Sequence, residues 1–98
     1  MPAYLIANVT ITDPEGFKHY GEQVSAVIAQ YGGRYLVRGG VIHPMEGDHG
    51  FDRLVVVEFP SMEAAKRFYD SPEYAPLLKL RIETTRSRLA FAEGYAPG

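Results

Sequence analysis

The chain has 98 residues, a formal net charge of −2 and no cysteine. A chain of this length is expected to form one domain, residues 1–98, and its charge gives no electrostatic reason to expect nucleic acid or an anionic membrane as a partner. The absence of cysteine excludes a disulfide and a thiolate nucleophile and suits a reducing compartment. No apolar run approaches the roughly 20 residues that span a bilayer. We therefore expect a globular, cytoplasmic protein.

The first third of the chain predicts a strand followed by a helix. Residues 4–11, YLIANVTI, alternate with the period of a strand, and a basic leader is lacking, so we interpret this segment as a first strand and not as a signal peptide. Asp13 or Thr12 can cap a helix that opens with Pro14 and carries apolar residues at helical spacing as far as Tyr31. The glycine pair at 32–33 is expected to end this helix.

The remaining elements follow from similar signals. Turn-forming and charged residues at 43–52, HPMEGDHGFD, indicate a loop, and Pro60 ends the strand before it because proline has no N–H to donate. Ser61 and Ser71 are predicted as helix caps, with Pro72 in the first turn of the last helix. The predicted elements are strands at 34–42, 53–59 and 88–95, a helix at 62–70, and a further helix starting at 71.

This order, β-α-β-β-α-β, predicts an α+β protein of the ferredoxin-like class: an antiparallel sheet with helices on one side and strands one and three in the centre. We assign the uniformly apolar side of the sheet to the helices. The other side is too apolar to face water, so we expect it to be buried against a second copy in a homodimer. The helix-covered side is predicted to carry Leu5, Ala7, Val9, Ile11, Val55, Val57 and Phe59, and the open side Tyr4, Ile6, Asn8, Thr10, Leu54, Val56 and Glu58, with Arg34, Leu36 and Arg38.

Several segments of the chain are distinctive when taken together: YLIANVTITDPEGFKHY, YGGRYLVRGG, MEG at 45–47, VVVEFPSMEAAKRFYDSPEY and Leu80-Arg81. In this order they resemble domain-of-unknown-function family 1330 of the dimeric α/β-barrel superfamily. The resemblance covers nearly the whole chain. It implies two ferredoxin-like subunits whose sheets face each other in a barrel with the helices outside. The superfamily includes cofactor-free monooxygenases, muconolactone isomerases, haem-degrading enzymes, peroxidases and stress-related proteins, so the fold by itself selects no activity.

Arg38 and Glu58 are the main candidates for chemistry, because both are assigned to the open face on adjacent strands. In one interpretation they form a structural ion pair that sets the register of the barrel. In the other, Arg38 binds a carboxylate or enolate oxygen of a substrate, and Glu58 acts as a base whose pKa is raised by burial. Asn8 would orient the substrate beside them, although a buried, satisfied amide is the alternative.

The other candidates lie outside the first two strands. His43 is predicted to move protons at the mouth of the pocket, and Tyr69 and Arg81 to contact the substrate. The group His43, Glu46, Asp48 and His49 contains metal-ligating residue types, but its spacing matches no dedicated motif, so no metal is predicted.

The segment YGGRYLVRGG lacks the spacing of a phosphate-binding loop, and RLVVVEF lacks the aromatic pattern of RNA-recognition strands. We therefore expect a homodimer that takes a small molecule, without nucleic acid, membrane or cofactor. Two functions stay open: a cofactor-free enzyme that acts on a small carbonyl-bearing or aromatic metabolite by proton transfer or monooxygenation, and a non-catalytic ligand-binding or stress-associated dimer. Whether the protein is an enzyme is left undecided.

Overall fold

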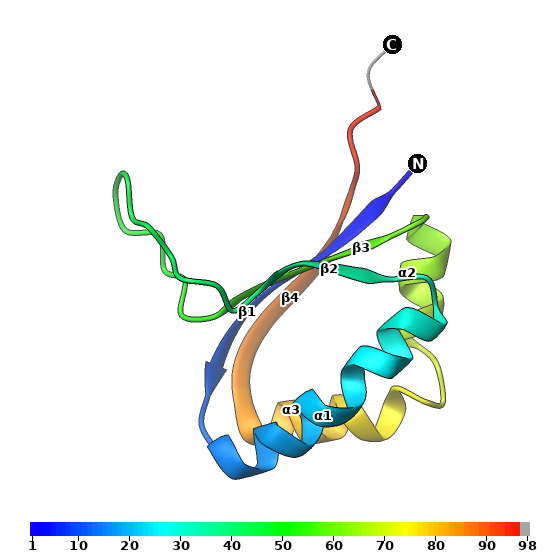
Figure 1. Cartoon of the computed structure of the whole chain (residues 1–98), viewed down its shortest axis with the longest axis horizontal. Coiled ribbons are helices and arrows are strands. Elements are labelled where there is room, and N and C mark those ends of the chain that lie inside the picture. The colour runs from blue at the N-terminus through cyan, green and yellow to red at the C-terminus, as the bar shows by residue number, and fades with distance from the viewer. Residues whose placement is uncertain (97–98) are drawn as a thin grey trace.

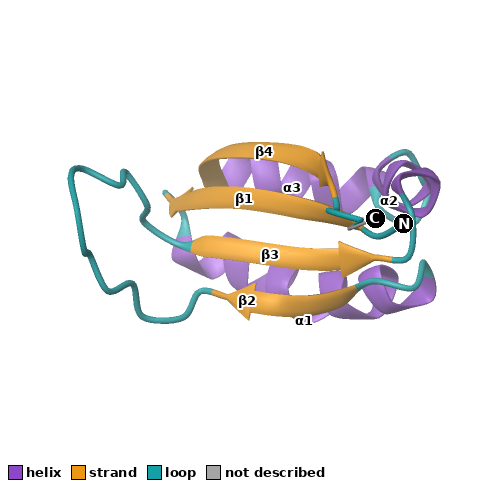
Figure 2. Cartoon of the chain, turned by 90° about the horizontal axis from the view of Figure 1, so that it is seen from above, coloured by secondary structure: helices purple, strands orange, loops and turns teal. Residues whose placement is uncertain are grey.

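A computed structural model describes residues 1–96 and confirms the predicted class. Four antiparallel strands form one sheet in the order β2-β3-β1-β4, and three helices lie on one side of it (Figures 1 and 2). The central pair is β1 and β3, as expected for a ferredoxin-like sheet. The elements are β1 (Ala3–Ile11), α1 (Pro14–Gln30), β2 (Arg34–Arg38), β3 (Leu54–Phe59), α2 (Met62–Tyr69), α3 (Ala75–Thr84) and β4 (Thr85–Glu93).

The core lies between the helices and one face of the sheet, and this face is the apolar one predicted from β1 and β3. Tyr74, Phe59, Phe68 and Val57 are the largest fully buried side chains. Ile11 departs from the prediction, since it lies at the end of β1 and is exposed. The buried apolar residues are Ala3, Leu5, Ala7, Val9, Val24, Ile28, Val57, Phe59, Ala65, Phe68, Tyr74 and Leu77.

Helix α1 begins and ends at the predicted signals. The side chain of Asp13 accepts a hydrogen bond from the backbone N–H of Gly16 at 3.2 Å, and Pro14 occupies the first helical position. Gly32 has a φ of +82°, the left-handed conformation that glycine adopts without a Cβ penalty. The helix therefore stops where the glycine pair predicts.

Strand β2 contains a β-bulge that the alternation of RYLVR does not reveal. Arg34 lies opposite Glu58, but the register shifts by one residue at Leu36, so that Arg38 lies opposite Val55. Residues that face each other across two strands project to the same side of the sheet, and a bulge adds one residue to one strand and reverses its alternation from there on. Arg34 is therefore on the open face with Glu58, as predicted, whereas the prediction that Arg38 shares this face is wrong.

Three element boundaries also differ from the predictions by three or more residues. Strand β2 ends at Arg38, four residues early, and β4 begins at Thr85, directly after α3. The segment 71–74 forms a hydrogen-bonded turn and not the first turn of a helix: the Ser71 hydroxyl accepts from the backbone N–H of Tyr74 at 3.1 Å and donates to the Phe68 carbonyl at 2.8 Å. The serine thus stabilises the turn, and α3 begins at Ala75.

The segment between β2 and β3, residues 39–52, projects beyond the end of the sheet and is called the arm (Figures 1 and 2). Its side chains Val41 and Met45 are 84% and 87% exposed. Arg38 and Arg53 flank the arm on either side. The arm is attached at the open face, where Asn8 donates to the Gly50 carbonyl at 3.0 Å and accepts from the Asp52 N–H at 2.8 Å.

Candidate functional site

A cavity of about 50 Å³ lies between α1 and the helix-covered face of the sheet. About 10–15 Å³ of such space suffices for one water molecule, so the cavity has room for a small group of atoms. Its floor is apolar and comes from the strands, and its walls are arginine and aromatic side chains. It is lined by Ala7, Val9, Phe17, Tyr20, Gly21, Val24, Tyr35, Arg38, Arg53, Val55 and Arg81.

Arg38 reaches this cavity because of the bulge in β2. Its Nη2 donates to the Gly21 carbonyl of α1 at 3.2 Å, and its guanidinium carbon lies 4.6 Å from the centre of the Tyr35 ring. Both partners are neutral. A guanidinium stacked on an aromatic face is held in a defined plane, so these two contacts hold this solvent-exposed side chain at the edge of the cavity.

Arg53 lies just before β3 and also lines the cavity. Its guanidinium carbon is 5.7 Å from the centre of the Phe17 ring on α1. Its Nε is buried and has no hydrogen-bond partner among the residues that the structure describes. A buried donor without an acceptor lowers the stability of a protein by about 1–3 kcal/mol. An acceptor on a bound ligand would remove this penalty.

Gly39 makes room for the Arg53 guanidinium. Its φ is +68°, and a side chain at this position would overlap Arg53 Nη1. Any other residue would therefore be strained and would also displace the arginine. The neighbouring Gly40 has open space where its Cβ would be, so only the first glycine of this pair is needed for the position of Arg53.

Arg81 is positioned by a buried polar network. It projects from α3 with only 6% of the residue exposed, and its Nε donates to the Tyr74 hydroxyl at 3.2 Å while Nη1 donates to the Ser87 hydroxyl. The Tyr74 and Tyr20 hydroxyls are hydrogen-bonded to each other at 3.0 Å. Burial, followed by the contact with Tyr74, raises the pKa of Tyr20 far above its ordinary value, so Tyr20 keeps its proton and borders the cavity as a neutral hydroxyl.

The cavity is positively charged without a matching acid. Within residues 1–96, no aspartate, glutamate or histidine lines it, while three arginines do. The two ion pairs found in that range join Arg34 to Glu58 and Arg67 to Glu63, both elsewhere on the molecule. Arginine stays protonated at any physiological pH, so the three charges are permanent.

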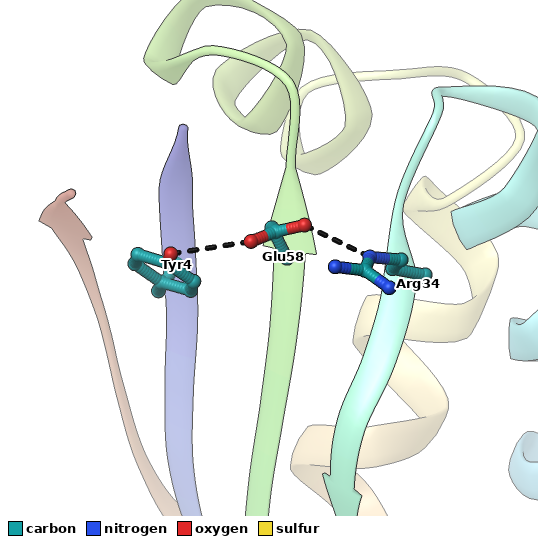
Figure 3. Close-up of polar contacts among 3 residues, drawn as sticks. All are labelled: Tyr4, Arg34 and Glu58. Carbon is teal, nitrogen blue, oxygen red and sulfur yellow. Dashed lines mark hydrogen bonds and ion pairs between the residues drawn. The ribbon is translucent and has the colours of Figure 1, made fainter. Parts of the chain in front are cut away.

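Glu58 lies on the opposite face of the sheet from this cavity, and its predicted partner was wrong. Figure 3 shows it between Arg34 and Tyr4: Oε1 accepts from Arg34 Nε at 2.8 Å, and Oε2 accepts from the Tyr4 hydroxyl at 3.2 Å. The hydrogen bond from Arg34 lowers the pKa of Glu58 below its ordinary 4.5 and outweighs burial. The expectation of a base with a raised pKa is therefore wrong, and the ion-pair interpretation holds with Arg34 in the place of Arg38.

Three other predicted residues also lie outside the cavity. Asn8 is a satisfied amide that holds the base of the arm. His43 lies within the arm, in a hollow that it shares with His49 and Phe51. Tyr69 packs against Tyr74 and Phe91 and lines a second hollow together with Arg81. Their catalytic and binding roles stay predictions, as does the absence of a metal; in residues 1–96 no three potential metal ligands come together.

Of the predicted site residues, Arg38 and Arg81 thus meet at this cavity, and Tyr69 lies with Arg81 in the second hollow. Arg53, Tyr20, Tyr35 and Phe17 were not predicted. The sequence does contain a signal for Arg53, because the alternation that assigns Val55, Val57 and Phe59 to the helix-covered face, continued backwards by two residues, assigns Arg53 to it as well. No comparable signal exists for the three rings, which look like ordinary core residues.

Comparison with known proteins adds a family to this geometry. The profile of "Domain of unknown function (DUF1330)" matches residues 2–95. The chain belongs to the DUF1330 family. No curated protein matches the sequence closely enough to serve as a relative.

Solved structures agree with this DUF1330 protein in fold. A protein of unknown function from Rhodopseudomonas palustris, RPA0582, superposes with a TM-score of 0.73 at 21% identity, over 98% of this chain and 84% of that one. SnoaB, a cofactor-independent oxygenase from Streptomyces nogalater, gives 0.63 at 15% identity, over 98% and 95%. A dimeric protein of unknown function with a ferredoxin-like fold from Bacteroides fragilis gives 0.59 at 16% identity, over 95% and 96%. Likeness at these identities shows the fold alone.

Within residues 1–96, no helix combines the length and the apolar character needed to cross a membrane.

Proposed function

We propose that this DUF1330 protein takes a small aromatic or carbonyl-bearing metabolite into the cavity between α1 and the sheet. One observation carries this proposal: side chains from β2, α1 and α3 meet around one hollow that has an apolar floor and aromatic walls. Small-molecule sites are typically apolar concavities with a few well-placed polar groups. Here the polar groups are Arg38, Arg53, Arg81 and the Tyr20 hydroxyl.

The first form of the proposal is a cofactor-independent enzyme. Arg38 would hold a carbonyl or enolate oxygen of the substrate, and Tyr20 would donate a hydrogen bond to a second oxygen. Preorganised donors of this kind stabilise charge that develops on oxygen during proton transfer or oxygenation. The fold that this chain shares with SnoaB, a cofactor-independent oxygenase, is compatible with such chemistry.

A second form, a non-catalytic binding protein, is favoured by a specific feature of the lining. Proton abstraction needs a base within hydrogen-bond reach of the substrate, and the lining holds no carboxylate or imidazole among the described residues. His43 could supply one only if the arm moved, since it lies there, outside the cavity. In this form the cavity would retain its ligand unchanged.

We further propose that residues 1–98 act as one domain of a cytoplasmic homodimer. The open face of the sheet exposes apolar side chains between its polar ends, with Ile6 40% and Leu36 46% exposed. Covering this face with a second copy would remove these groups from water. A protein of similar fold from Bacteroides fragilis is described as dimeric. Light scattering coupled to gel filtration tests this part, and a monomer mass at micromolar concentration would contradict it.

The test of ligand binding uses Gly21, a residue of α1 that lines the cavity. A Cβ on Gly21 meets no atom within 4 Å, so Gly21→Leu is expected to fill the cavity while leaving the fold intact. Native mass spectrometry and a thermal-shift panel of single-ring aromatic and carbonyl compounds would identify ligands of the wild-type protein. We expect Gly21→Leu to abolish their binding and Glu22→Leu, at the next and exposed position of α1, to retain it.

Equal ligand binding by the wild type and Gly21→Leu would contradict the proposed cavity. To separate the two forms, the bound ligand is incubated with protein in air and followed by oxygen consumption and mass spectrometry. Turnover supports the enzyme; recovery of the unchanged ligand supports the binding protein.

A further inference from the structure

We infer that the cavity selects an anion, namely a small, planar, single-ring or shorter acid that presents a carboxylate or enolate oxygen to Arg53 and Arg38. This inference rests on the proposed function and adds the charge class of the ligand. It follows from three independent features of the lining: uncompensated charge, an unsatisfied donor, and shape.

The uncompensated charge is the first feature. Arg38, Arg53 and Arg81 come from three separate parts of the chain and line one hollow. The hydrogen-bond acceptors found for Arg38 and Arg81 in residues 1–96 are a backbone carbonyl and two hydroxyls, all neutral. Like charges repel, and the low dielectric of a partly enclosed site increases this repulsion. An anion in the cavity would relieve it, whereas a cation would add to it.

The unsatisfied donor is the second feature. Arg53 Nε is buried with no acceptor among the described residues, although buried polar groups in native proteins nearly always have one. The guanidinium lies beside the Phe17 ring of α1 and in the space that Gly39 leaves open by lacking a Cβ. An oxygen of a ligand would complete this hydrogen bond, and a carboxylate matches the fork of a guanidinium best.

The shape of the cavity is the third feature. Phe17, Tyr20 and Tyr35 supply flat apolar walls beside the arginines, so a planar ligand can stack there while its charged end meets the guanidinium groups. The volume of about 50 Å³ is small. It fits a carboxylate and the adjoining atoms of one ring better than a polycyclic compound.

The experiment measures dissociation constants by NMR titration of the full-length wild-type protein with four probes: benzoate, its neutral counterpart benzamide, acetate and inorganic phosphate. We expect benzoate to bind at least about tenfold more tightly than each of the other three. In Arg53→Met and Arg38→Met the affinity for benzoate should fall by about tenfold or more. Arg34→Met, which removes an arginine of the same sheet from the open face, is the matched control and should leave it unchanged.

Arg53→Lys is a control for a purely structural effect of the substitution. It keeps the positive charge and removes the forked pair of guanidinium N–H donors. We expect an affinity between those of the wild type and Arg53→Met. A benzoate affinity that is the same in the wild type, Arg53→Met and Arg38→Met would overturn the inference. So would stronger binding of phosphate than of benzoate, because the site would then recognise phosphate and not an aromatic acid.

Failure of this inference can be told apart from failure of the proposed function. If benzamide binds as tightly as benzoate and Gly21→Leu abolishes both, the cavity takes small aromatic molecules but does not select for charge. If neither binds, anion selection fails, and the proposed function is decided by whether Gly21→Leu removes binding of the ligand identified by mass spectrometry.

Discussion

On the open face of the sheet, the carboxylate of Glu58 lies between Arg34 and Tyr4 and accepts a hydrogen bond from each. On the helix-covered face, Arg38, Arg53 and Arg81 surround a cavity that no acid lines within residues 1–96. The first group needs no further partner, since its charges and hydrogen bonds are matched within the chain. The second contains a buried donor for which residues 1–96 provide no acceptor. The contrast indicates that arginines on a sheet are evidence for a ligand site when no acidic side chain of the protein neutralises their charge.

The largest effect is expected from Gly39→Ala, which disturbs the arginines of the cavity and leaves the open face unchanged. Alanine at a φ of +68° is strained, and its Cβ would displace the Arg53 guanidinium. We expect a loss of roughly 2–3 kcal/mol in the free energy of unfolding, measured by urea denaturation. Gly40→Ala is the control, because its Cβ meets no atom within 4 Å, and it should change stability by about 0.5 kcal/mol at most. Equal effects of the two substitutions would show that Gly39 does not hold Arg53.

Tyr74→Phe tests whether Arg81 is oriented by its network. The substitution removes the hydroxyl that accepts from Arg81 and pairs with Tyr20, leaving two partly buried donors with fewer partners. We expect a loss of about 1.5 kcal/mol in urea denaturation and weaker binding of the cavity ligand. Tyr95→Phe, at a residue that is 87% exposed, should alter neither. Unchanged stability in Tyr74→Phe would mean that packing alone orients Arg81.

Gly21→Ala separates the cavity from the stability of the helix around it. Glycine inside a helix costs about 0.8–1 kcal/mol relative to alanine, and the added Cβ enters open space. We therefore expect the free energy of unfolding to rise by up to about 1 kcal/mol, with a moderate loss of ligand affinity because the cavity shrinks. A decrease in stability on urea denaturation would show that this part of the cavity is already filled.

The smallest effect is expected on the open face, from the titration of Glu58. Its pKa in the folded protein lies below 4.5, mainly because of the hydrogen bond from Arg34. A group with a depressed pKa stabilises the fold above its unfolded value, and the contribution is lost as the pH falls through the folded value. Glu58→Gln should therefore flatten the fall of the melting temperature below pH 4.5.

The control for this titration is Arg34→Met, which should have the same effect on the pH dependence by removing the main cause of the shift. A profile for Glu58→Gln that matches the wild type at every pH would show that the pair contributes nothing to stability. Neither substitution is expected to alter ligand binding in the cavity, which distinguishes the two faces once more.

The sequence predicted the candidate site correctly where a strand is regular and wrongly where it is not. Alternation in β1 and β3 assigned Leu5, Val9 and Phe59 to the core correctly, because these strands are paired without interruption in the stretch concerned. The same reasoning, continued by two residues, would have assigned Arg53. In β2 it failed at Leu36, and with it failed the predicted pair of Arg38 and Glu58.

The sequence by itself determined the order of the elements, the helix boundaries at Asp13 and Gly32, the apolar face of the sheet and the family. These follow from local chemistry: period, capping and backbone freedom. Only the tertiary structure decided which arginine meets Glu58 and which enters the cavity. A β-bulge belongs to a pair of strands and not to either strand alone, so YGGRYLVRGG could show two arginines at a strand-like spacing but not that they point to opposite faces.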